Sequence, residues 1–173
     1  LLGVVLMQKG DIEAAIYSIK SSLEIDPENP NALDHLGVML ADTGKLKEAI
    51  VCFAQALHLA PDYGVCWRNF GFVKELARDW SGAIEAYQKA IELEANYAAA
   101  HAGLGGVLLQ IGAFEDALET FDTAILLDPS HKPTLVKRAE VLRRLRYFSE
   151  AITAYREIFS QPSDEASLAQ YIG

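Results

Sequence analysis

The segment WRNFGFVKELARDWSGAIEAYQKA, residues 67–90, contains a pattern that recurs along the whole chain. Its first glycine belongs to a series of small residues spaced 34 positions apart: Gly3, Gly37, Gly71, Gly105, Ala139 and Gly173. A fixed period of this length is typical of a solenoid, in which similar units stack in a row, and not of a single globular core.

Other positions of this segment recur at the same spacing. One is a small residue, at Ala15, Ala49, Ala83, Ala117 and Ala151. Four residues later each unit has a bulky side chain, at Ile19, Phe53, Tyr87, Phe121 and Tyr155. A second small position follows, at Ala56, Ala90 and Ala124. A small residue facing a bulky one lets two helices approach closely and interlock.

Within each unit the apolar residues lie three and four positions apart, as one face of a helix requires. Ala49, Phe53 and Ala56 show this spacing. Gly44 separates this helix from an earlier one, and Gly10 and Gly112 are expected to make the same tight turn in their units. Prolines then end the second helix at Pro27, Pro61 and Pro129. Each unit is therefore predicted to be a helical hairpin.

Two units have arginine where the others have the turn glycine. Because Arg78 and Arg146 carry side chains, we expect their turns to adopt a geometry that a side chain tolerates. The third and fifth units should then be locally less regular.

The pattern resembles that of the tetratricopeptide repeat family, whose signature is a large residue, then Leu-Gly, and later Ala, an aromatic, Ala and Pro. The best match is Trp67 to Gly71 followed by Ala83, Tyr87 and Ala90. The resemblance implies an all-α, right-handed superhelix of about five helix-turn-helix repeats. It covers nearly the whole chain, with a partial repeat at residues 1–29, full repeats at 30–63, 64–97, 98–131 and 132–165, and the start of a further repeat at 166–173.

The composition argues against several classes of function. A net charge of −9 disfavours nucleic-acid binding, which depends on clustered Lys and Arg. Two cysteines, Cys52 and Cys66, are too few for a disulfide framework or a zinc site, and reduced thiols suit the cytoplasm. No apolar run approaches the roughly 18 to 20 residues of a membrane span, so direct membrane insertion is not expected.

The sequence singles out no catalytic, cofactor or metal site. The cluster Gly103-Leu104-Gly105-Gly106 lacks the spacing and the preceding strand of a phosphate-binding loop. The four histidines share no ligand spacing with acidic residues or cysteines. We therefore expect a protein that is not an enzyme and needs no cofactor.

Charge is distributed unevenly between two neighbouring units. Residues 98–131 contain five acids and no Lys or Arg, whereas residues 132–165 contain seven basic residues and five acids. Six of the basic residues fall on the first helix of that unit or its turn: Lys132, Lys137, Arg138, Arg143, Arg144 and Arg146. One interpretation is a solvated helix face. The other is a patch in which Arg143 and Arg144 bind carboxylates or a phosphate of a peptide.

In the family that the chain resembles, the first helices line a concave groove that binds extended or helical peptides. This resemblance implies the following peptide-binding residues: Asn31, Asp34, Arg68, Asn69, Phe72, Glu75, Ala102, Gly106, Leu109, Lys137, Glu140, Arg143 and Arg144. The groove would be acidic at one end and basic at the other, with Ala102 and Gly106 as a floor open to a partner's backbone. Phe72 and Leu109 are the expected apolar anchors.

We therefore predict a protein-interaction scaffold that binds a peptide segment of a protein partner, with acidic residues of that segment near Arg143 and Arg144. Two alternatives stay open at this point. Neither end of the sequence shows the polar capping helix that usually closes a repeat array, so the chain is expected either to be a fragment of a longer array or to self-associate through its ends. It could also be the targeting domain of a larger enzyme.

Overall fold

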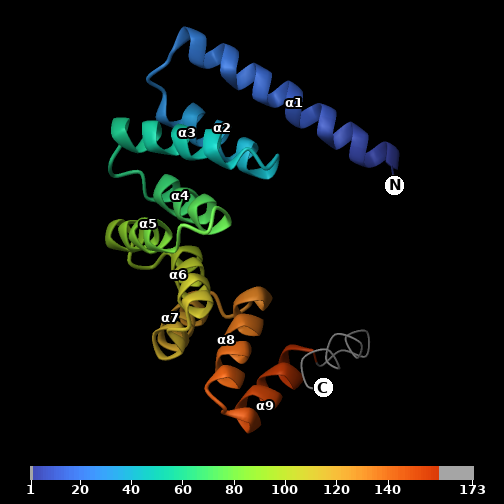
Figure 1. Cartoon of the computed structure of the whole chain (residues 1–173), viewed down its shortest axis with the longest axis vertical. Coiled ribbons are helices and arrows are strands. Elements are labelled where there is room, and N and C mark those ends of the chain that lie inside the picture. The colour runs from blue at the N-terminus through green and yellow to red at the C-terminus, as the bar shows by residue number, and fades with distance from the viewer. Residues whose placement is uncertain (1, 160–173) are drawn as a thin grey trace. The chain divides into compact units, whose positions relative to one another are not determined.

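The computed structural model describes residues 2–159, with side chains from residue 12 onward, and every regular element in this range is an α-helix (Figure 1). The helices are α1 (Leu2–Ile25), α2 (Pro30–Asp42), α3 (Leu46–Leu59), α4 (Gly64–Leu76), α5 (Trp80–Leu93), α6 (Ala98–Ile111), α7 (Phe114–Leu127), α8 (Lys132–Arg144) and α9 (Phe148–Ile158). They form two compact units, the first ending at Leu93 and the second beginning at Glu94.

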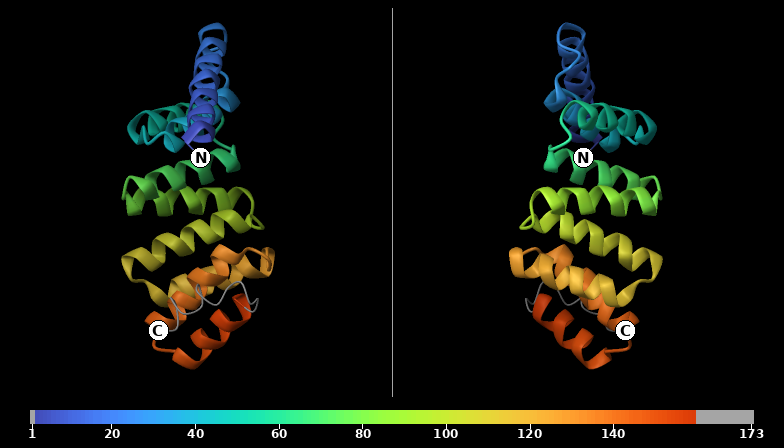
Figure 2. Two further views of the ribbon diagram at one scale, coloured as in Figure 1. Left: turned by 90° about the vertical axis from the view of Figure 1, so that its right-hand side faces the viewer. Right: turned by 90° about the vertical axis from the view of Figure 1, so that its left-hand side faces the viewer.

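Inside each unit the helices pair as successive hairpins. In the first unit α2 packs against α3 and α4 against α5, while α1 covers α2 and α3 contacts α4. In the second unit α6 packs against α7 and α8 against α9, and α7 contacts α8. Figure 2 shows α4 and α5, drawn in green, lying side by side. The predicted all-α class of stacked helical hairpins is confirmed.

The two helices of a hairpin interlock through the small and bulky positions of the repeat. A Cβ atom added to Gly37 would lie 2.8 Å from the ring of Phe53, and one added to Gly71 would lie 2.9 Å from the ring of Tyr87. Gly105 has the same relation to Phe121. In the last hairpin Ala139 and Tyr155 are buried in one cluster. The period of the sequence therefore corresponds to a direct packing contact.

All four hairpin turns use the same backbone geometry, so the predicted irregularity of the third and fifth units is wrong for their turns. The residue after the first helix is left-handed in each, with φ of 78° at Gly44, 84° at Gly112, 60° at Arg78 and 66° at Arg146. Each turn also has the same two hydrogen bonds, as in Arg78 N–H to Glu75 C=O and Asp79 N–H to Lys74 C=O. The two arginines are tolerated because their φ values fall in the small left-handed region that is open to L-residues.

The first predicted hairpin differs from the others. Gly10 lies inside α1, which is one continuous helix from Leu2 to Ile25, so the predicted turn at this glycine is wrong. An isolated glycine costs a helix only about 1 kcal/mol relative to alanine, which good helix formers on both sides can offset. Residues 160–173, with the end of the predicted repeat 132–165 and the predicted start of another at 166–173, lie outside the described residues.

Candidate peptide-binding surfaces

In the first unit, a chain of polar side chains joins the first helices of two successive repeats. The Asp34 side chain on α2 is 3% exposed, and its Oδ1 accepts a hydrogen bond from Asn69 Nδ2 on α4 at 3.0 Å. The Oδ1 of Asn69 in turn accepts a bond from Arg68 Nη1 at 2.8 Å. A buried carboxylate needs such partners because its transfer out of water is costly. Asn69 thus holds both Asp34 and Arg68 in place.

The thiol of Cys66 lies under this chain and is fully buried. Burial, with a further contribution from the nearby Asp34 carboxylate, raises the pKa of Cys66 far above its ordinary value. The thiol therefore stays protonated at neutral pH.

The exposed part of the same surface is an apolar stripe on α4. Phe72 is 45% exposed and Leu76 is similarly accessible. They follow Arg68 at intervals of four residues, so the three side chains share one face of the helix. Glu75, one position before Leu76, is held from below by the Tyr87 hydroxyl, which donates to its Oε2 at 3.0 Å. Burial, and then the Glu75 carboxylate, raise the pKa of Tyr87, which keeps the hydroxyl a donor.

The six predicted site residues of the first unit differ in how exposed they are, and two of them, Asn69 and Glu75, are half-buried. Phe72 and the exposed Asn31 face solvent, and Arg68 is half-buried. Asp34 is buried, which differs from the expected contact position, because Asn69 of the next repeat covers its carboxylate.

In the second unit, the expected open floor on α6 is not present. Gly106 is buried and Ala102 half-buried, because α8 packs against α6. Ala102 lines a small cavity of about 60 Å³ together with Thr134 of α8. Leu109, the second predicted anchor, is half-buried against a cluster that contains Phe121 and Val141. These positions therefore pack the unit internally.

Two arginines of α8 form a triad with one carboxylate. Arg143 donates to Glu140 from Nε at 2.8 Å and from Nη2 at 2.7 Å, and Arg144 Nε donates to Glu140 Oε1 at 2.7 Å. The bond from Arg143 is the main reason that the pKa of the Glu140 carboxyl lies below its ordinary value. The Arg144 guanidinium also lies 5.9 Å from the centre of the Phe114 ring. The triad is fixed and carries one net positive charge, with about half of each arginine side chain exposed.

Three other basic residues lie on the same helix. The Nζ atom of Lys132 lies 4.8 Å from the centre of the Phe159 ring. Lys137 is exposed, and Arg138 forms an ion pair with Asp122 of α7. The charge segregation seen in the sequence is therefore partly neutralised in the fold.

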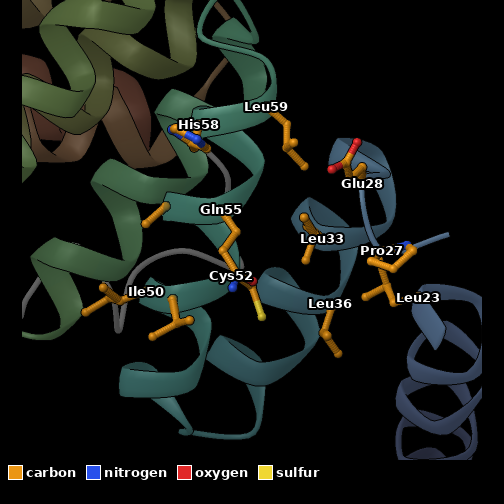
Figure 3. Close-up of a pocket in the computed structure, with 12 residues that line it drawn as sticks. Leu23, Pro27, Glu28, Leu33, Leu36, Ile50, Cys52, Gln55, His58 and Leu59 are labelled. Carbon is orange, nitrogen blue, oxygen red and sulfur yellow. The ribbon is translucent and has the colours of Figure 1, made fainter.

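A groove between α1, α2 and α3 was not predicted (Figure 3). It has a volume of about 710 Å³ and includes Leu33 and Leu36 in its lining. The signal was present in the repeat itself, since the next unit has Trp67 and Phe70 at the matching positions.

Two searches of the described part of the chain address other kinds of site. No group of three or more His, Cys, Asp or Glu side chains among the described residues is placed to hold a metal ion. No helix among them combines the length and apolar character that a membrane crossing requires.

Comparison with known proteins identifies the family. The family model described as tetratricopeptide repeat matches residues 6–67 and 76–139. A crystal structure of MamA protein is 25% identical, with a TM-score of 0.78, and the match covers 95% of this chain and 90% of that one. None of the curated protein sequences matches the chain.

Two further solved structures share the fold at lower identity. PilF of Pseudomonas aeruginosa is 24% identical, with a TM-score of 0.80 over 92% of this chain and 72% of that one. YrrB, described as a TPR protein with an unusual peptide-binding site, is 17% identical, with a TM-score of 0.75 over 89% and 79%. Because the family model matches well over half of its residues, the chain belongs to the tetratricopeptide repeat family.

Proposed function

We propose that this chain is a non-enzymatic interaction module that binds peptide segments of partner proteins on its first helices. Membership of a family of protein-interaction repeats supports this role. So does the description of YrrB, a protein of the same fold, as having a peptide-binding site.

The observation that carries the proposal is the exposed face of α4. Phe72 is an accessible aromatic side chain on a rigid helix, one turn from an arginine that Asn69 already holds in position. Buried aromatic side chains contribute much of the energy of protein interfaces. A surface that is ordered before binding also loses little conformational entropy on association. A partner peptide would cover Phe72 and Leu76 and place an acceptor against Arg68.

A selection from a displayed peptide library tests this surface. Peptides that bind the wild-type chain are measured again with Phe72→Ala, which should weaken binding by about tenfold or more. Leu93→Ala is the matched control, because Leu93 on α5 is also 45% exposed but lies on a second helix. Equal affinity for wild type and Phe72→Ala, or an equal loss with Leu93→Ala, would contradict the assignment.

In the second unit, we propose that the triad of Glu140, Arg143 and Arg144 binds acidic residues of a partner. Each guanidinium has N–H groups beyond those used by Glu140, and arginine pairs well with carboxylates. The triad is already ordered, so a carboxylate would meet donors that are in place.

The probe for this site is an acetylated hexapeptide of alternating glutamate and alanine, titrated at low salt. Reversal of both arginines, Arg143→Glu with Arg144→Glu, should abolish its binding. The control Lys47→Glu with Lys89→Glu changes the net charge equally in the other unit and should have a much smaller effect. The site assignment is wrong if the arginine reversal leaves the affinity unchanged, or if both pairs reduce it equally.

A further inference from the structure

The groove between α1, α2 and α3 is formed mainly by apolar side chains. Those shown in Figure 3 include Leu23 from α1, Leu33 and Leu36 from α2, and Ile50 and Leu59 from α3. Its volume of about 710 Å³ falls in the range of roughly 300 to 1,000 Å³ that is common for small-ligand sites. The groove lies on other helices than the exposed face of α4.

The next repeat of the same unit has a matching position, and there a side chain fills it. Trp67 stands 34 positions after Leu33, and Phe70 stands 34 positions after Leu36. The Trp67 indole Nε1 donates a hydrogen bond to the Pro61 carbonyl at 2.8 Å, and its ring packs against Phe70 with 6.2 Å between ring centroids. Pro61 matches Pro27, which lines the open groove. The indole therefore occupies the position that Leu33 leaves empty one repeat earlier.

The second unit shows that this ring-to-carbonyl contact is a recurring feature. His101 stands 34 positions after Trp67, and its Nε2 lies 3.0 Å from the Ala95 carbonyl oxygen. Leu33 has no polar hydrogen, so it cannot make the corresponding bond to the Pro27 carbonyl. In the open groove, therefore, the Leu33 side chain supplies neither a ring that fills the space nor an N–H that donates a hydrogen bond, as the Trp67 ring does in the next repeat.

The edge of the open groove also differs in charge from its filled counterpart. Val51, Gln55 and His58 line the groove, and the matching residues in the next repeat are Glu85, Lys89 and Glu92. Among the described residues of the lining, Glu28 is the acidic one and none is Lys or Arg. This distribution favours an aromatic group with a neighbouring positive charge.

We propose that the groove binds a tryptophan side chain from a peptide segment of a partner protein. The indole occupies the place that Trp67 fills in the next repeat and donates its N–H to the Pro27 carbonyl. A Lys or Arg beside that tryptophan pairs with the Glu28 carboxylate at the edge of the groove. The interaction is independent of the proposed binding on α4 and α8.

The probe is an acetylated, amidated pentapeptide with the sequence Gly-Lys-Trp-Lys-Gly, titrated into the full chain by calorimetry. We expect saturable binding that weakens by about tenfold or more when the tryptophan of the probe is replaced by alanine. Replacement of its lysines by glutamate should also weaken binding. Equal affinity for the tryptophan and alanine peptides would overturn the proposal.

Variants of the chain locate the site. Leu33→Trp fills the groove from inside and should reduce the affinity for the pentapeptide by about tenfold or more. Val51→Lys places a positive charge in the lining at a site that is 55% exposed, so it should weaken binding of the lysine-containing pentapeptide without disturbing the core. Ile111→Ala, at a 47% exposed position of α6 in the other unit, should leave binding of the pentapeptide unchanged. Wild-type affinity in both Leu33→Trp and Val51→Lys would overturn the proposal.

A matched pair of variants tests the role of the Glu28 carboxylate. Glu28→Gln should weaken binding, whereas Asp62→Asn, at the matching position beside the filled place, should not. An equal loss in the two variants would show only general attraction to an acidic protein and would contradict the assignment to the groove.

Discussion

The Asn69 side-chain amide on α4 donates to the buried Asp34 carboxylate on α2 at 3.0 Å, so one hydrogen bond ties two successive repeats together. The same amide accepts from Arg68, on the surface proposed to bind peptides. Repeat packing and the order of the binding surface therefore depend on a shared side chain.

Removal of this amide should destabilise the first unit. Asn69→Ala removes the amide that donates to the buried Asp34 carboxylate, so we expect a loss of about 1–3 kcal/mol in the free energy of unfolding. Denaturant unfolding followed by circular dichroism measures the loss. Asn31→Ala, at an exposed position of α2, should change the stability by less than about 0.5 kcal/mol. Similar losses in the two variants would refute the role given to Asn69.

The close approach of the hairpin helices gives a second prediction. In Gly71→Ala the new methyl group would lie 2.9 Å from the Tyr87 ring, so overpacking should cost about 1–3 kcal/mol. Gly64→Ala, on the same helix, places its methyl group 3.7 Å from Leu93, an ordinary contact, and should not destabilise. Thermal unfolding of both variants distinguishes steric conflict from a general effect of removing glycine.

The four left-handed turns give a third prediction. A non-glycine residue in this conformation destabilises the folded state by about 1–2 kcal/mol. Replacing it with glycine removes this cost but also raises the conformational entropy of the unfolded chain, which offsets part of the gain. Arg78→Gly and Arg146→Gly should therefore stabilise the fold by about 0.5–1 kcal/mol each. Gly44→Ala and Gly112→Ala should destabilise it by a similar amount, although nothing lies within 4 Å of either new methyl group. If the glycine and alanine variants changed stability in the same direction, the conformational account would fail.

The triad of Glu140, Arg143 and Arg144 on α8 should make the free energy of unfolding depend on pH. The pKa of Glu140 is lowered from its ordinary 4.5 in the folded chain, so the folded state favours the ionised form. The resulting stabilisation is present above pH 4.5 and is lost as the pH falls through the folded-state pKa. Wild type should therefore be more stable than Glu140→Gln at pH 7, and this difference should shrink at pH 3. A difference in unfolding free energy that grows toward acid would contradict the proposed pairing.

The sequence predicted the hairpins because their packing contacts are local to one period. The pairing of Gly71 with Tyr87 needs only the spacing of two positions in one unit, and the spacing shows it directly. The turn at Arg78 was misjudged because the cost of a left-handed arginine is small enough for the helices on both sides to enforce it. Gly10 was misjudged for a similar reason, since a lone glycine marks a turn only when its neighbours also favour one.

The candidate surfaces were harder to predict because they depend on contacts between repeats. The burial of Asp34 depends on how α4 lies against α2, and no spacing within one unit reports this. The pairing of Arg143 and Arg144 with Glu140 could have been read from their spacing on one helix, which would have reduced the expected charge of the patch. The groove at Leu33 is present because the leucine side chain is smaller than the tryptophan at the matching position. This difference is visible only when Leu33 is compared with Trp67 one repeat later.

The most direct test of peptide binding on the first helices is a nuclear magnetic resonance titration of the ¹⁵N-labelled chain with a selected peptide that loses affinity for Phe72→Ala. We predict that the shifted backbone amides gather on α4 between Arg68 and Leu76 and on the facing part of α2, while those of α5 are unchanged. Shifts concentrated on α3 and α5, with Phe72 and its neighbours unaffected, would contradict the account.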